Sequence, residues 1–332
     1  MEHLLRRLRT VPSALTFGIV MSVTFPVWLP LVVVFDLLTV GRRLPAARLM
    51  VFTTYFALCE MFAIVTAIGL WVVSGFGRLR LRSAYVWIQA TWLWWLMLGA
   101  RALLGVRVEG TGPLPLPSGN VVVLSRHTSL ADTVLPGHLL LKLSSRSAHY
   151  VLKRELQWLP SLDLYGHRLG NLFVVRGGNT EHELQLINDL GVQAAPDAGL
   201  VIFPEGTFNT VAKRAQVVAS LRSSGRDDLA DYAASLRHLL PPKPAGTLAL
   251  LDSQPTADVV VLGHIGLDGL SEPGALRAML PLSEPVRLQW WTHSRQEVDN
   301  YPGGPEAWLR DRWVELDEWI AAGLAETNPP RH

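Results

Sequence analysis

The sequence predicts an α/β fold, a mixed, largely parallel sheet flanked by helices, with a membrane helical hairpin at the N-terminus. Two observations carry this prediction. The first hundred residues consist mainly of long apolar segments, whereas the rest of the chain alternates short apolar runs with helix-like segments. Such alternation of strands and helices is typical of layered α/β folds. The chain has 332 residues, enough for one large domain with attachments.

The composition narrows the class of protein. Hydrophobic residues make up 49% of the chain and charged residues only 17%, with a mean hydropathy of +0.24. This is more apolar than an ordinary soluble domain. The net charge of +2 gives no reason to expect nucleic-acid binding. The single cysteine, Cys59, cannot form an intramolecular disulfide or a cysteine-based metal site, so the chain is compatible with a reducing compartment.

Two apolar blocks begin the chain. Residues 10–35 carry no charge, and residues 49–77 are interrupted only by Glu60. A membrane-spanning helix needs about 20 apolar residues, so either block is long enough. Pro26 and Pro30 kink the first block or let it re-enter, which leaves a hairpin embedded from one side as the alternative to two spans. A signal peptide is rejected because the stretch is too long and a second one follows.

The placement of arginines predicts the orientation of these blocks. Six arginines lie on the side that the N-terminus would share with the rest of the chain, namely Arg6, Arg7, Arg9, Arg78, Arg80 and Arg82. The loop between the blocks carries three, Arg42, Arg43 and Arg48. The positive-inside rule therefore predicts an inner-membrane protein whose remaining chain faces the cytoplasm.

A tryptophan-rich segment follows. Residues 83–100 carry no charge and include Trp87, Trp92, Trp94 and Trp95. Tryptophan favours the membrane–water interface, so we predict an interfacial helix, with a third span as the alternative. The expected organisation is a membrane hairpin or two transmembrane helices over residues 1–80, the interfacial helix over 81–105, and the α/β domain over 106–332.

The α/β domain is expected to contain seven strands. Short apolar runs predict them at residues 106–108, 121–124, 150–152, 172–175, 200–203, 259–264 and 286–291. Helices are expected at residues 130–142, 180–194, 228–239 and 246–252, with a final amphipathic helix at about 305–324.

The stretch LSRHTSLADT, residues 124–133, places His127 five residues before Asp132. Five residues along a helix leave two side chains roughly 140° apart. The pair can therefore meet only if His127 lies in a turn and Asp132 in the first helical turn, with Thr128 or Ser129 as the N-cap. Asp132 would then hold one imidazole nitrogen and leave the other free to act as a general base.

No protein nucleophile accompanies this pair in a recognisable motif. The patterns G-x-S-x-G, G-x-G-x-x-G and the P-loop are absent. The base would then activate a hydroxyl of a substrate or a water molecule. A metal-dependent hydrolase with His127 and Asp132 as ligands would need further ligands at a metal-site spacing, and no convincing set is found, so we predict no metal.

Three further stretches extend the pattern. They are GNLFVVR at residues 170–176, VIFPEGTF at 201–208 and DVVVLGHIG at 258–266. In this order after H-x-x-x-x-D they resemble the glycerolipid acyltransferase family, the 1-acylglycerol-3-phosphate O-acyltransferases and related lysophospholipid acyltransferases. The resemblance covers about residues 105–266 and includes KREL at 153–156 and LLPPKPAGTLALL at 239–251.

The resemblance implies a mechanism. His127 would take a proton from a hydroxyl of a lysophospholipid, most of all 1-acylglycerol-3-phosphate, and Asp132 would orient it. The hydroxyl would attack the thioester of acyl-CoA or acyl carrier protein directly, with no cofactor and no acyl-enzyme. The expected partners are membrane lipids and the acyl donor, and residues 106–332 would be the catalytic domain.

The resemblance also implies an acceptor site. Gly170, Arg176, Glu205, Gly206 and Thr207 would belong to it. The planar guanidinium of Arg176 suits a phosphate, and Gly206 would let the backbone approach the ligand. Glu205 is expected to position a basic group or the glycerol.

Two positions depart from the family pattern. Arg126 stands where the family often has Asn, and Phe208 where it often has Arg. The missing cation leaves the acceptor's phosphate partly unaccounted for, and the candidate replacements are Lys153, Arg126, Lys213 and Arg214. Lysocardiolipin, glycerol-3-phosphate or a non-phosphate alcohol therefore stays open as the acceptor. A non-enzymatic scaffold is disfavoured because the motif residues are intact.

Overall fold

The computed structural model describes residues 2–76, 78–79, 81–175, 180–268, 270 and 274–327. The chain forms two compact units. The first unit contains residues 1–107, 152–176 and 274–285, and the second contains residues 108–151, 177–273 and 286–332. The division at residues 80 and 105 that the sequence suggests stays a prediction.

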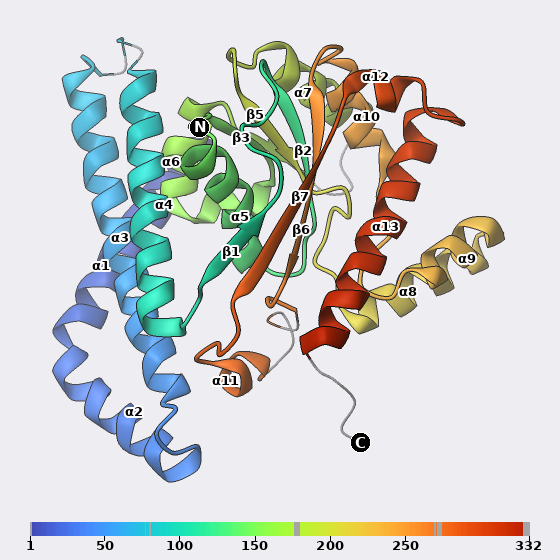
Figure 1. Cartoon of the computed structure of the whole chain (residues 1–332). Helices are drawn as coiled ribbons and strands as arrows, with labels where there is room; N and C mark the ends of the chain where they lie inside the picture. The colour runs from blue at the N-terminus through green and yellow to red at the C-terminus, as the bar shows by residue number, and fades with distance from the viewer. Residues whose placement is uncertain are drawn as a thin grey trace. The chain divides into compact units, whose positions relative to one another are not determined.

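Seven strands of the described chain form one sheet (Figure 1). They are β1 (Val108–Thr111), β2 (Val121–Ser125), β3 (Ala148–Lys153), β4 (Leu172–Val174), β5 (Gly199–Ile202), β6 (Asp258–Ile265) and β7 (Val286–His293). The strand order is β1-β7-β6-β2-β5-β3-β4. Strand β2 pairs in parallel with β5 and β6, whereas β6 and β7 run antiparallel. The predicted fold class, a mixed and largely parallel sheet, is confirmed, and a strand lies at or next to each predicted position.

Burial explains the sequence of the central strand. All five residues of β2, VVVLS, are buried, because neighbouring strands lie on both sides and packed layers cover both faces. Parallel strands buried on both faces read as continuous apolar runs without alternation. This is why the sequence shows an unbroken Val121–Leu124 run directly before His127.

Helices flank the sheet in the second unit. They are η1 (Leu130–Thr133), α5 (Val134–Gly137), η2 (His138–Leu143), α7 (Thr180–Val192), α8 (Val211–Ser223), α9 (Asp227–Ser235), α10 (Pro244–Asp252), α12 (Arg295–Asp299) and α13 (Gly304–Thr327). Helix α13 runs along β6, and α7 packs against α10 (Figure 1). The helices predicted at residues 180–194, 228–239, 246–252 and 305–324 are present.

Two helical segments differ from expectation. Residues 130–143 do not form one α-helix but a 3₁₀ turn, an α turn and a π turn in succession, with Pro136 inside the series. Helix α8 was not predicted, and none of its residues is buried. A helix that buries nothing carries no apolar stripe, so the periodicity that reveals a helix in a sequence is missing.

The first unit is mainly helical. It contains α1 (Glu2–Val23), α2 (Phe25–Thr39), α3 (Pro45–Val73), α4 (Arg82–Leu104), η3 (Arg154–Trp158), α6 (Pro160–Leu169) and α11 (Ala275–Met279). By length and composition α3 could cross a membrane, and α1 and α2 together form a second candidate, bent by 69°. The bend falls at Thr24, the N-cap of α2, and Pro26 lies in the first turn of that helix. This geometry suits a broken or re-entrant segment.

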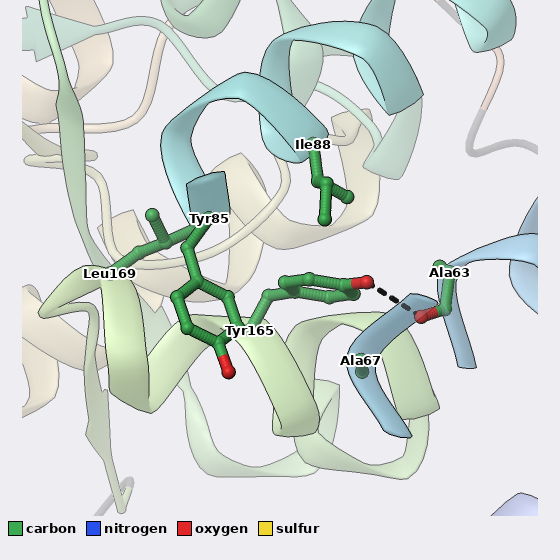
Figure 2. Close-up of a cluster of buried hydrophobic side chains, with 6 residues drawn as sticks. All are labelled: Ala63, Ala67, Tyr85, Ile88, Tyr165 and Leu169. Atoms are coloured by element: carbon green, nitrogen blue, oxygen red, sulfur yellow. Dashed lines mark hydrogen bonds between the residues drawn. The ribbon is translucent and has the colours of Figure 1, made fainter. Parts of the chain in front are cut away.

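One hydrophobic core joins three helices of this unit (Figure 2). It contains Ala63 and Ala67 of α3, Tyr85 and Ile88 of α4, and Tyr165 and Leu169 of α6. The Tyr165 hydroxyl donates a hydrogen bond to the Ala63 carbonyl oxygen at 2.7 Å. A buried phenol with its polar end satisfied fixes α6 against α3.

Two glycines in these helices allow a matched test of the packing. A Cβ on Gly99 of α4 would lie 2.2 Å from the ring of Tyr55, whose hydroxyl is held by the Trp95 carbonyl oxygen. A Cβ on Gly69 of α3 would meet nothing within 4 Å. Gly99→Ala should therefore destabilise the protein by about 1–3 kcal/mol through overpacking. Gly69→Ala should be neutral or stabilise it by up to ~1 kcal/mol.

The measurement is the midpoint of thermal unfolding of both variants and the parent protein in the same detergent. Equal midpoints for the two variants would contradict the close approach of α3 and α4 at Gly99.

Candidate active site

The candidate site lies where three neighbouring strands end. Strands β5, β2 and β6 run in parallel side by side, so their carboxyl ends share one edge of the sheet. His127 follows β2, the segment beginning at Phe203 follows β5, and His264 lies near the end of β6. Ligand sites of parallel α/β sheets form at this edge. All of these residues belong to the second unit.

The contact that the sequence predicts between His127 and Asp132 is present. Nδ1 of His127 lies 2.8 Å from Oδ1 of Asp132. Oδ2 of Asp132 accepts hydrogen bonds from the backbone N–H groups of Thr128 at 2.5 Å and Ser129 at 2.8 Å, and from the Thr128 hydroxyl at 3.0 Å. Ser129 is the N-cap of η1, and Asp132 is the third residue of that helix. The capping interaction thus aims the carboxylate at the imidazole.

The charge of Asp132 is stabilised although the side chain is fully buried. Burial alone would raise the pKa of this carboxyl, but the hydrogen bond with His127 and the charge of His127 and of the nearby His264 hold it well below its usual range. A carboxylate that stays ionised can fix the imidazole tautomer and stabilise an imidazolium. The arrangement can therefore support a general base at Nε2 of His127, and this catalytic role stays a prediction.

Glu205 fastens the backbone of His127. Its Oε1 accepts the His127 backbone N–H at 2.9 Å, and its Oε2 accepts the Leu240 backbone N–H at 3.0 Å. Asn209 completes the attachment by donating its backbone N–H to the His127 carbonyl oxygen at 3.0 Å. Burial raises the pKa of Glu205 to about 8, and the two N–H donors oppose that rise.

These contacts correct the expected role of Glu205. We expected the side chain to position a basic group or the glycerol of the acceptor. It is instead 1% exposed, and both carboxyl oxygens bind backbone N–H groups of the protein. Glu205 thus positions the histidine itself.

The sequence F-P-E-G explains how Glu205 reaches His127. The backbone N–H of Gly206 donates to the Phe203 carbonyl oxygen at 2.9 Å, which closes a β-turn with Pro204 in its second position. Gly206 has φ +65°, a conformation that favours glycine. Thr207 follows and is half-buried. The turn directs Glu205 back toward the end of β2.

Two aromatic rings enclose the imidazole. The ring of Phe203 lies 4.3 Å from that of His127, tilted by 33°, and the ring of Phe208 lies 4.5 Å away, at 62°. The side chain of His127 keeps 6% of its surface exposed. From the sequence, Phe208 was noted only because it replaces an arginine that is frequent in the family, and Phe203 was not singled out. Phe203 directly precedes the P-E-G-T segment and Phe208 directly follows it. This pair of flanking aromatic residues is the sequence signal that could have predicted the packing.

Arg126 is engaged by the protein. Its side chain is fully buried, and its guanidinium donates to the carbonyl oxygens of His264 at 2.5 Å and His238 at 3.2 Å. It also forms an ion pair with Asp268. These contacts do not support the expected contact between Arg126 and a phosphate of the acceptor. They show instead a cross-link among three segments around the site.

The remaining predicted cations differ in their placement. Nη1 of Arg214 donates to the Asn209 side-chain oxygen at 2.7 Å, so this cation is connected to the segment that holds His127. Nζ of Lys213 donates instead to Gln216 within α8. Lys153 ends β3 and Gly170 ends α6 with φ +79°. These last two belong to the first unit, and Arg176 lies outside the described residues. Their predicted ligand contacts stay predictions.

Among the described residues, no group of three or more His, Cys, Asp or Glu side chains could hold a metal ion. The site does contain His127, Asp132 and His264, but Oδ2 of Asp132 already accepts three hydrogen bonds from the protein's own backbone and hydroxyl groups. The chemistry that these residues support is proton transfer at an imidazole.

Comparisons with known proteins define the class. Residues 105–241 match the family model described as Acyltransferase. The chain therefore contains an acyltransferase domain, which confirms the predicted family. A search of curated proteins found no match. The solved structure of the 1-acyl-sn-glycerophosphate (LPA) acyltransferase PlsC from Thermotoga maritima is similar at 15% identity, covering 96% of this chain and 98% of that chain, with a TM-score of 0.44. A likeness at that score supports no conclusion about activity.

The double acceptor role of Glu205 can be tested with Glu205→Gln. An amide has one acceptor oxygen, so its NH₂ group would face the N–H of His127 or Leu240. We expect a loss of about 1–3 kcal/mol in unfolding free energy, because a buried donor loses its partner. The displaced His127 should also lower turnover. Chemical unfolding and an acyl-transfer assay measure the two effects.

The matched control is Glu109→Gln, because Glu109 lies exposed on β1. This variant should stay within roughly 0.5 kcal/mol of the parent protein. Parent-like stability and turnover in Glu205→Gln would show that the carboxylate does not hold the His127 backbone.

Proposed function

We propose that this protein transfers a fatty acyl group from an acyl thioester, acyl-CoA or acyl carrier protein, to a free hydroxyl of a lysophospholipid. The observation that carries the proposal is the buried His127–Asp132 contact of 2.8 Å at the end of β2, within a domain of the acyltransferase family. The reaction would serve phospholipid biosynthesis or remodelling.

The proposed chemistry needs no acyl-enzyme. Nδ1 of His127 is held by Asp132, so Nε2 takes the proton of the acceptor hydroxyl. The oxygen attacks the thioester carbonyl and forms the new ester bond as the carbon–sulfur bond breaks. The imidazolium returns its proton to the departing thiolate. Asp132 stabilises the imidazolium between these two steps, because its carboxylate stays ionised.

The surface of the first unit supports attachment to a membrane. Large apolar side chains are exposed on each of its first four helices, among them Val23 at 72%, Leu38 at 82%, Val73 at 75% and Trp87 at 65%. Exposed apolar surface on this scale marks a membrane or protein contact. A membrane-bound enzyme meets lipid acceptors in the bilayer and a soluble acyl donor in the cytoplasm. We therefore place the protein at the inner membrane, with its catalytic domain in the cytoplasm.

The acceptor we propose first is 1-acylglycerol-3-phosphate. A second candidate class contains lysocardiolipin, glycerol-3-phosphate and non-phosphate alcohols. Two observations favour keeping it. Phe208 packs against His127 at a position where a cation would serve a phosphate, and the buried Arg126 is bound by protein acceptors.

The test is acyl transfer by the purified protein to a panel of these acceptors, with acyl-CoA and acyl carrier protein as alternative donors. His127→Ala should lower turnover by about 10²–10⁴-fold on the preferred acceptor, since it removes the general base. His182→Ala, on the exposed side of α7, serves as the control and should keep parent activity.

Undiminished turnover in His127→Ala would refute the mechanism. A chelator distinguishes the metal-dependent hydrolase: loss of activity in its presence, restored by a metal ion, would favour that alternative.

A further inference from the structure

His264 is a buried histidine that the proposed mechanism does not use. It lies near the end of β6, which pairs in parallel with β2 in a register that sets Ser125 opposite Leu262. The side chain is fully buried, and among the described residues neither ring nitrogen has a hydrogen-bond partner. Buried polar groups are nearly always paired, so an unpaired imidazole at this depth requires an explanation.

A carboxylate oxygen of the site lies near this ring. Nε2 of His264 lies 3.4 Å from Oδ2 of Asp132. Asp132 therefore lies between two imidazoles, with His127 on Oδ1 at 2.8 Å and His264 on the side of Oδ2. A separation of 3.4 Å is longer than a good hydrogen bond. Hydrogen bonds of catalytic sites are often long without substrate and shorten in the reacting complex.

The other charged groups around His264 are already paired. Arg126, from the end of β2, binds the His264 carbonyl oxygen and forms an ion pair with Asp268, which follows β6. Glu205, from the turn after β5, binds two backbone N–H groups. Asp132 is thus the anion that the His264 ring can serve.

We propose that His264 is a positioning residue for acyl transfer, acting on His127 through Asp132. With its proton on Nε2, the ring donates to Oδ2 and limits the negative charge that Asp132 presents to His127. A carboxylate without this donor would stabilise the imidazolium more strongly. The imidazolium would then release its proton to the departing thiolate more slowly. The inference rests on the proposed function, in which His127 is the base.

The test compares two side chains of equal length, His264→Gln and His264→Met. Gln carries an N–H donor in place of Nε2–H, and Met fills similar space without a donor. We expect His264→Met to lower kcat by about tenfold, the usual effect of losing a hydrogen bond to a charged group. KM for donor and acceptor should be unchanged. The midpoint of the rising limb of the pH–rate profile should move to higher pH. His264→Gln should restore both kcat and the midpoint toward the parent values.

Equal kcat values and equal pH-profile midpoints in the two variants would overturn the proposal. They would show that the side chain at position 264 only fills space and that its hydrogen-bond donor has no effect. A third comparison introduces His264→Met into Asp132→Asn. The effect of His264→Met should vanish there, whereas an undiminished effect would show that His264 does not act through Asp132.

If the variants do not fold, the parent protein still decides the question. Spectra of ¹⁵N-labelled histidine, assigned by through-bond correlation, should show His264 protonated on Nε2. A His264 protonated only on Nδ1 would overturn the proposal. Failure of the proposed function would be recognised separately, because it would appear as full activity in the His127→Ala variant.

Discussion

The candidate site depends on one buried carboxylate. Asp132 accepts hydrogen bonds from two backbone N–H groups and one hydroxyl of the loop after β2, and its other oxygen lies 2.8 Å from His127. Such a set of donors keeps a fully buried carboxyl ionised. The same contacts fold the loop and orient the imidazole, so local structure and chemistry arise from one group. Without the charge, the loop would lose its capping interaction and the histidine its orientation.

A second buried carboxyl group joins this loop to the neighbouring strand. Glu205 holds the His127 backbone, and the turn that presents Glu205 needs Pro204 and Gly206. Two motifs that lie 78 residues apart in sequence are thus parts of a single hydrogen-bonded unit. Parallel pairing of β2 with β5 brings them together, because it places the carboxyl ends of both strands at one edge. The enclosing rings of Phe203 and Phe208 come from the same segment.

Much of the fold was predictable because its signals are local. Continuous valine and leucine runs revealed β2, β5 and β6, and the spacing of His127 and Asp132 fitted a turn followed by a helical residue. The failures concern long-range contacts. Three contacts depend on which strands are neighbours. They are the ion pair of Arg126 with Asp268, the approach of His264 to Asp132, and the packing of Phe208 on His127. The spacing of apolar residues predicts where strands lie in the sequence but not the order of the strands in the sheet. Helix α8 was missed because it buries no side chain.

The most direct test of the mechanism asks whether the acyl group is ever bound to the protein. The purified protein is incubated with acyl-CoA in the absence of acceptor, and its intact mass is measured before and after a lysophospholipid is added. We expect an unmodified mass throughout, with ester formed only after the acceptor is added, because His127 activates the acceptor hydroxyl and no side chain is acylated. An acyl adduct that forms with the donor alone and disappears when the acceptor is added would contradict direct transfer.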